Sequence, residues 1–193
     1  HMGIVTTVSN KNYMYLDELV KAVKDFDLSW HFINLGTYSN DDIIKDHTKF
    51  MKDNLNTDTY CLEAYNTSYN EGIDGEIFSE ILEKIHNLKP GYPIITVPAI
   101  NPDKIGEYYS NLDVIVREKC TVPWSQCNID YNGDVHFCAD YPEYILGNIK
   151  DDKLLNILNN ERSVKFRNTL KDTEHGLFPG CVRCYQNMLF GHK

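Results

Sequence analysis

Five of the six cysteines in the 193-residue chain lie after residue 119, and their spacing limits what the C-terminal part can fold into. Cys181 and Cys184 form a C-x2-C pair, the spacing at which two thiolates from one tight loop reach a single metal centre. Cys138 closes a short hairpin pattern, and Cys120 precedes that hairpin. The hairpin and the distant C-x2-C loop together predict a cage of four thiolates that two separate segments of the chain supply.

The favoured metal ligands are therefore Cys120, Cys138, Cys181 and Cys184. Cys127 is an alternative ligand, but alternation along the strand places it inside the core of the hairpin, where a free cysteine is often simply buried. Cys61 stands alone in a polar segment, and we expect it to take no part in the metal site.

The sequence as given shows no signal peptide, so the expected location is cytoplasmic and reducing, where a disulfide framework explains the cysteines poorly. Four thiolates suit either zinc or an iron–sulfur cluster, and the spacing does not separate the two. A thiol–disulfide oxidoreductase that uses Cys181 and Cys184 is a third hypothesis, in which Arg183 lowers a thiol pKa. It is weaker, because the pair is expected to follow a loop instead of leading a helix in a βαβ unit.

The composition limits the possible partners. A hydrophobic share of 42% is ordinary for a globular domain, and no run of 18 apolar residues exists to form a simple membrane span. The formal charge of −9 argues against a nucleic-acid partner, because binding phosphates relies on clustered Lys and Arg. The basic stretch 161–171 is interpreted as the solvated face of a helix.

Strand and helix patterns alternate before residue 119. Strands are expected at 3–9, 30–36, 92–100 and 112–118, and amphipathic helices at 15–26, 41–53 and 76–90. This order predicts βαβ units and a parallel sheet, with too few strands for a (β/α)₈ barrel of ~250 residues. The polar segment 54–75 is expected to be a long loop, and the domains are expected to be 3–118 and 119–193.

Local signals shape the second domain. Asn132 and Gly133 predict a two-residue hairpin turn in which both have positive φ. Asp151 is expected to cap a helix within 147–160. The neighbouring polar residues Asp134, His136 and Asp140 are expected to be exposed hairpin positions with no role in the site.

The spacing from Cys120 to Cys138 fits C-x12-G-x4-C, and "LGNI", a helix and "CVRC" follow. This stretch resembles the SPASM/twitch domains that lie C-terminal to the barrel of radical S-adenosylmethionine (radical SAM) enzymes. With one C-x2-C and no later cysteine, it is similar to the shorter twitch form, which carries one auxiliary [4Fe–4S] cluster. The implied fold class is α/β: a partial (β/α) barrel segment followed by a small Cys-rich domain of a β-hairpin plus helix.

The resemblance implies a radical SAM oxidoreductase that modifies a peptide, a protein or a small metabolite. A cluster in the barrel cleaves S-adenosylmethionine (SAM), and the resulting 5′-deoxyadenosyl radical abstracts a hydrogen from the substrate. The auxiliary [4Fe–4S] cluster then accepts an electron or positions the substrate, and four cysteine ligands favour the electron-transfer role. Ser9 and Asn10, just past the first strand, are the implied cofactor-binding residues for SAM.

The sequence departs from that family in one respect, because the C-x3-C-x2-C motif that holds the SAM-cleaving cluster is absent. Together with the His-Met start, this predicts a fragment that lacks the N-terminal half of the barrel and does not cleave SAM alone. A half-barrel also leaves an unpaired sheet edge, through which homo-oligomers are expected. The alternative function is a structural zinc-binding module with four cysteines on an α/β domain that binds a partner.

Overall fold

The computed structural model describes residues 2–66 and 70–191, apart from the side chain of Phe190. The chain divides into two compact units. We call the first, His1–Thr37 with Thr67–Val116, the sheet unit, and the second, Tyr38–Asn66 with Arg117–Lys193, the cysteine unit. The chain therefore enters the cysteine unit, returns to the sheet unit and leaves it again.

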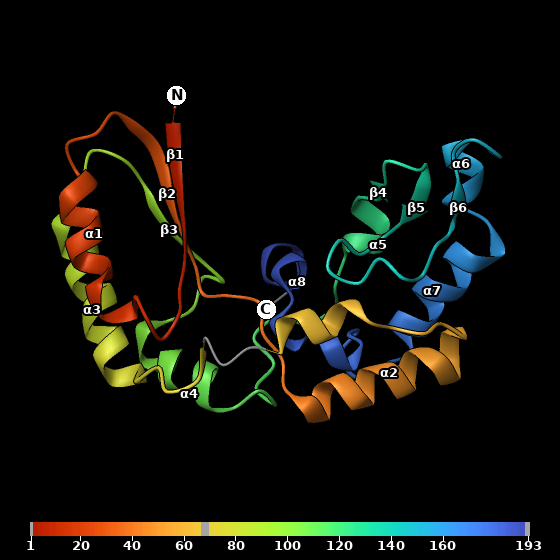
Figure 1. The fold of residues 1–193 in the computed structure, drawn as a ribbon, viewed down its shortest axis with the longest axis horizontal. Helices are drawn as coiled ribbons and strands as arrows, with labels where there is room; N and C mark the ends of the chain where they lie inside the picture. The colour runs from red at the N-terminus through yellow and green to blue at the C-terminus, as the bar shows by residue number, and fades with distance from the viewer. Residues whose placement is uncertain (1, 67–69, 192–193) are drawn as a thin grey trace. The chain divides into compact units, whose positions relative to one another are not determined.

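The sheet unit contains a parallel sheet with helices on one side (Figure 1). Its strands lie in the order β1-β2-β3 and span Met2–Thr7, Leu28–Asn34 and Ile94–Val97. Its helices are η1 (Tyr13–Tyr15), α1 (Leu16–Val23), α3 (Gly75–Leu88), η4 (Pro102–Lys104) and α4 (Ile105–Ser110). The predicted alternation of strands and helices is present, and the described sheet is open instead of closed into a barrel.

The helices of the sheet unit form because apolar residues recur at helical spacing. Leu16 and Val20 of α1, and Phe78 and Ile85 of α3, are buried at 3% exposure or less. The side chain of Asp74 caps α3 by accepting hydrogen bonds from the first backbone N–H groups of the helix. These two helices bury one face of the sheet.

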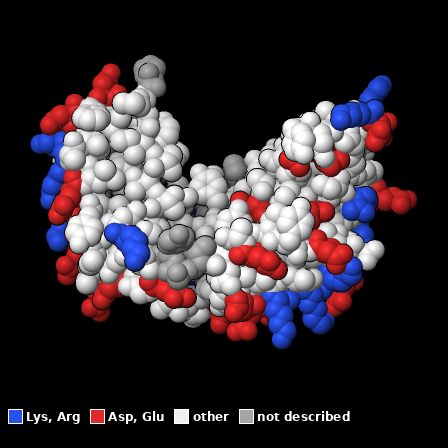
Figure 2. Space-filling view, in the orientation of Figure 1, with Lys and Arg blue, Asp and Glu red and all other residues white. Residues whose placement is uncertain are grey.

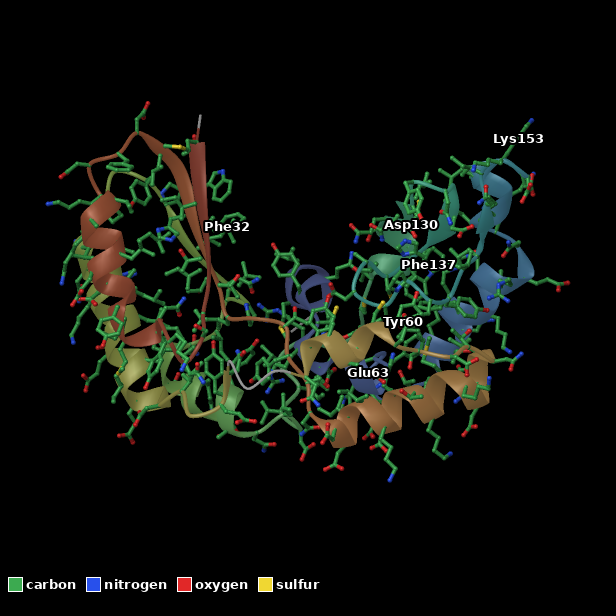
Figure 3. All side chains as sticks on the ribbon, viewed as in Figure 1. Phe32, Tyr60, Glu63, Asp130, Phe137 and Lys153 are labelled. Atoms are coloured by element: carbon green, nitrogen blue, oxygen red, sulfur yellow. The ribbon has the colours of Figure 1, made fainter. Side chains whose placement is uncertain are left out.

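The other face of this sheet is apolar, and in the part of the sheet unit that the structure describes no helix covers it. Val5, Phe32 and Ile95 form one row across the three strands, and Figure 3 shows Phe32 on the side away from α1 and α3. Val5 is 59% and Ile95 41% exposed. Trp30 packs beside Phe32, with 4.6 Å between ring centroids.

The expected fourth strand at 112–118 is absent, which corrects that prediction. The segment contains turns, bends and one isolated bridge at Glu118. A β-branched run becomes a strand only where it pairs with a neighbouring strand, whereas this segment leads out of the sheet unit after Val116. Between this segment and β3 lie η4 and α4, which the sequence did not predict.

The cysteine unit combines short helices with a three-stranded antiparallel sheet of order β4-β5-β6. The strands span Asn128–Ile129, Asp134–His136 and Gly147–Asn148. The helices are α2 (Asp41–Leu55), η2 (Cys61–Tyr65), α5 (Val122–Ser125), α6 (Leu154–Ile157), α7 (Glu161–Lys171), η5 (Pro179–Arg183) and α8 (Tyr185–Phe190). None of the helices in the described part of the chain has the length and apolar character needed to cross a bilayer.

The segment 38–66 packs in the cysteine unit, whereas the predicted domain 3–118 assigned it to the barrel segment. The physical reason is a core of aromatic rings in which Phe50 of α2 packs against Phe178, and Phe178 against Phe166 of α7. The outer face of α2 carries interspersed charges, visible in Figure 2, and the pair Lys49–Asp53 lies at 2.6 Å. The expected loop 54–75 also contains η2, while its residues 67–69 lie outside the described residues.

Two local predictions in the cysteine unit need correction. The hairpin between β4 and β5 exists, but only Gly133 has positive φ, at 95°. The N–H of Gly133 donates to the carbonyl of Asp130, as in a three-residue loop that ends on a left-handed glycine. The helix after β6 has its N-cap at Lys153 instead of Asp151, because Asp151 still belongs to the turn that follows Asn148.

Candidate metal centre

The C-x2-C pair lies on a tight turn at the junction of η5 and α8. Cys181 and Cys184 are each 5% exposed, and the N–H of Cys184 donates to the carbonyl of Cys181 at 3.2 Å. The helix α8 begins directly after Cys184, but the described sheet of the cysteine unit is antiparallel, so the pair does not lead a helix of a βαβ unit. Two buried cysteines therefore come from one tight turn.

The other two cysteines reach this turn through backbone contacts. The N–H of Cys120 donates to the carbonyl of Gly176 at 3.3 Å, five residues before Cys181. Two side chains of α8 bind the backbone beside the remaining ligands. Gln186 accepts from the N–H of Ala139 at 3.0 Å, and Asn187 donates to the carbonyl of Arg117 at 3.0 Å. The helix behind the C-x2-C turn thus holds the chain next to Cys138 and close before Cys120.

Electrostatics show that the four thiols lie near one another. Burial raises the pKa of Cys138, Cys181 and Cys184 well above that of a free thiol, and raises the pKa of Cys120 as well. Neighbouring thiols raise these pKa values further: Cys184 and Cys120 act on Cys138, and Cys120 and Cys138 act on Cys181. Cys181 and Cys184 are buried, and Cys120 and Cys138 are partly buried. The four thiols fit a thiolate-binding group, and such a group has to displace their protons when it binds.

The raised pKa values argue against the hypothesis that Cys181 and Cys184 serve a thiol–disulfide oxidoreductase. A reactive cysteine needs a lowered pKa, and here burial raises the pKa of both Cys181 and Cys184. Arg183 between them is 1% exposed and points to Tyr38, whose hydroxyl lies 3.3 Å from its Nε. The expected effect of Arg183 on a thiol is therefore contradicted.

Across residues 2–66 and 70–191, no group of three or more His, Cys, Asp or Glu side chains is placed to hold a metal ion. The four thiols are nevertheless near enough for Cys120 and Cys184 to raise the pKa of Cys138.

The two remaining cysteines occupy different surroundings. Cys127 lines a separate cavity of about 500 Å³ together with Phe137, Leu155 and Arg167. Cys61 lies in the cysteine unit, where burial first and then the Glu143 carboxylate raise the pKa of its thiol to about 11. The backbone N–H of Cys61 donates to Glu143 at 2.7 Å.

Three polar residues that the sequence did not assign to the site form hydrogen bonds at the proposed ligands or beside them. The Sγ of Cys184 donates to Oδ2 of Asp140 at 3.1 Å, and the hydroxyl of Tyr65 donates to Oδ1 of the same carboxylate at 3.2 Å. His136 is 4% exposed, and its Nδ1 lies 2.6 Å from the carbonyl of Cys138. The expectation that Asp140 and His136 are exposed positions is therefore wrong, since His136 is buried and Asp140 is partly buried. Their places two residues on either side of Cys138 are the signal that pointed to them.

Ser9 and Asn10 lie in the sheet unit, directly after β1. The N–H of Ser9 donates to the Asn12 side chain at 2.8 Å, and its hydroxyl accepts from the N–H of Lys11 at 3.3 Å. The amide of Asn10 donates to the carbonyl of Glu71 at 3.0 Å. These bonds build a local turn, and the cofactor-binding role of the two residues stays a prediction.

The comparisons with known proteins concern the same stretch that contains the four thiols. The family model of the SPASM domain, described as an iron–sulfur cluster-binding domain, matches residues 120–185. No curated protein and no solved structure matches the chain significantly. The matched stretch begins at Cys120, includes Cys138, and ends one residue after Cys184. Residues 120–185 therefore match the model of a family whose domains bind iron–sulfur clusters.

Proposed function

We propose that Cys120, Cys138, Cys181 and Cys184 bind one [4Fe–4S] cluster, and that this cluster is the auxiliary cluster of a radical SAM oxidoreductase. The observation that carries the proposal is the grouping of four buried or partly buried cysteines, from three places in the sequence, within a stretch that matches the SPASM family. A set of four cysteines is the usual ligand set of such a cluster.

The family match supports a cluster over the alternative, a structural zinc ion. Four thiolates are a ligand set that suits either group, but the matched family is described as binding iron–sulfur clusters.

Electron transfer is the role that the surroundings of the thiols favour. A [4Fe–4S] cluster, when bound, supplies one-electron chemistry at a potential set by burial, charge and hydrogen bonds to its sulfurs. Water has little access to Cys181 and Cys184, because each is 5% exposed. All four proposed ligands are cysteines, which leaves no open coordination position for a substrate. Asp140 places a carboxylate at Cys184 and so contributes to that potential.

In this proposal the sheet unit contributes to SAM and substrate binding, with Ser9 and Asn10 as the residues that contact SAM. The substrate class is a peptide, a protein or a small metabolite, as in enzymes that the sequence resembles.

The test is the iron, acid-labile sulfide and zinc content of anaerobically purified protein, before and after reconstitution with iron and sulfide. About four irons and four sulfides per chain, with a broad absorption band near 400 nm, are expected for one such cluster. One zinc and no sulfide in both preparations would replace the proposal with the structural zinc module.

A further inference from the structure

The segment 38–66 contacts the C-x2-C turn directly, although the SPASM match begins only at residue 120. His47 of α2 is fully buried at 0% exposure. Its Nδ1 accepts a hydrogen bond from the backbone N–H of Gly180, at 3.1 Å, and Gly180 is the residue immediately before Cys181. The ring also packs against Tyr141, with 5.1 Å between centroids.

Both backbone groups of Gly180 have a partner within the cysteine unit. Its N–H binds His47, and its carbonyl accepts a hydrogen bond from the hydroxyl of Tyr141. A Cβ added at Gly180 would lie 2.9 Å from Leu62 and 3.0 Å from the His47 ring. The backbone that presents Cys181 is therefore held on three sides, twice by residues of the segment 38–66.

The hydrogen bond fixes the chemical form of His47. Since Nδ1 accepts, the ring proton is on Nε2, which is buried and has no partner among the described atoms. Burial lowers the pKa of His47 to about 4, and the Glu143 carboxylate opposes this only in part. The ring is neutral at neutral pH, as an acceptor at Nδ1 requires. An apolar side chain here would fill the space but leave the Gly180 N–H buried without a partner.

We infer that the segment 38–66 is part of the cluster-binding site, and that His47 is a positioning residue for Cys181. A second contact of the same kind supports the inference. Tyr65, at the end of η2, donates to Asp140, which in turn accepts from Cys184. His47 thus bonds to the residue before Cys181, and Tyr65 bonds to the carboxylate that accepts from Cys184. The inference rests on the proposed function, since it concerns ligands of the proposed cluster.

The test compares His47→Leu with His47→Asn in the full chain. Leu keeps an apolar side chain but removes the acceptor, whereas the Asn carbonyl can stand where Nδ1 stands and accept from Gly180. The control is Phe50→Leu, which removes aromatic packing from the same helix and leaves the hydrogen bond intact. Each reconstituted variant is exposed to a chelator, and the loss of absorption near 400 nm is timed. The reduced cluster is compared by electron paramagnetic resonance.

We expect His47→Leu to lose the cluster about tenfold faster than wild type or more, because it leaves a buried donor unsatisfied. Its paramagnetic signal should also shift, while His47→Asn retains the wild-type lifetime and signal. Amide hydrogen exchange at Gly180 in metal-free protein should be faster only in His47→Leu. Equal lifetimes in wild type and His47→Leu, or equal losses in His47→Leu and Phe50→Leu, would overturn the inference.

The failure of the proposed function would look different. If wild-type protein takes up no iron and sulfide, both the proposed function and the positioning role for a cluster are overturned. The exchange rate at Gly180 then still reports whether His47 holds the turn. A cluster of normal lifetime in His47→Leu would leave the proposed function standing and reject the inference alone.

Discussion

The thiol of Cys184 donates a hydrogen bond to the carboxylate of Asp140 across 3.1 Å. Once Cys184 binds a metal as a thiolate it has no proton to donate, so the carboxylate oxygen then faces a negatively charged sulfur. Tyr65 remains as a donor to the other carboxylate oxygen. Asp140 is therefore a negative charge held beside the proposed cluster, and such a charge lowers a reduction potential.

Replacing Asp140 by Asn is expected to raise the reduction potential of the cluster by roughly 60 mV, the shift of a tenfold change in a one-electron equilibrium. The amide removes the charge and offers a donor to the sulfur. A potentiometric titration followed by absorption measures the shift. Asp134→Asn is the control, because Asp134 bonds with Asn132 and Asn148 on the hairpin. Equal potentials in wild type and Asp140→Asn would rule out this role.

The proposed set of four ligands predicts how single Cys→Ser substitutions change the iron and sulfide content. Exchange of any one of the four proposed ligands should reduce iron and sulfide well below about four of each per chain. Cys127→Ser and Cys61→Ser should leave both contents unchanged, because Cys127 lines a separate cavity and Cys61 bonds with Glu143 instead. Iron and sulfide assays on the reconstituted variants decide the question. A loss in Cys127→Ser equal to that in Cys120→Ser would assign the fourth ligand to Cys127.

The close approach at Gly180 predicts a cost for any side chain there. Gly180→Ala should lower the free energy of unfolding of the cysteine unit by roughly 1–3 kcal/mol, since the new methyl would overlap the fixed His47 ring. Urea unfolding of metal-free protein measures the change. Gly91→Ala is the matched control, because an added Cβ at Gly91 has nothing within 4 Å. A stability of Gly180→Ala like that of Gly91→Ala would contradict the packing described.

Buried His47 predicts how stability depends on pH. Its pKa of about 4 in the folded protein lies below the 6.5 expected when it is unfolded, so the unfolded chain binds more protons between these values. The contribution is present above pH 6.5 and is lost as pH falls towards 4, by about 2 kcal/mol between pH 7 and pH 5. Urea titrations of metal-free wild type and His47→Asn at both pH values test this. The variant should lose less stability on acidification, and equal losses would contradict the buried neutral ring.

The open sheet predicts self-association. β1 and β3 are the edge strands of the described sheet, and Val5 and Ile95 expose an apolar face beside these edges. Light scattering should give a mass above that of one chain, and Val5→Lys should lower it towards the monomer. Val164→Lys, at a valine 42% exposed on α7, should not. A monomeric mass for wild type would contradict the prediction.

The sequence predicted those parts of the fold that depend on local periodicity. Apolar spacing found β1, α1, β2, α2 and α3 to within a few residues, because the pattern that predicts each element lies within its own segment. The same reasoning failed at 112–118, where strand formation depends on a neighbouring strand and not on the run itself. The same reasoning also assigned α2 to the wrong unit. An amphipathic pattern indicates that one face of a helix is buried, but it does not indicate which element covers that face.

In the site as well, the local pattern of residues was predictable and the contacts with distant segments were not. The spacing of the cysteines, read with a family resemblance, pointed to the stretch that the SPASM family matches. His47 and Tyr65 could not be found in this way, because they reach the site from a segment far away in the sequence. His47 and Gly180 are 133 residues apart. Asp140 was within reach, but its spacing from Cys138 does not show that its carboxylate points to Cys184.

The return of the chain to the sheet unit after residue 66 has a consequence for biosynthesis. A ribosome adds about 5–20 residues per second, so α2 emerges roughly ten seconds before the turn against which it packs. During this time the apolar side of α2, with Met51 and Leu55, has no final partner. Chains that stop before residue 180 are thus expected to be targets for chaperones and proteases, even when the sheet unit has been synthesised in full.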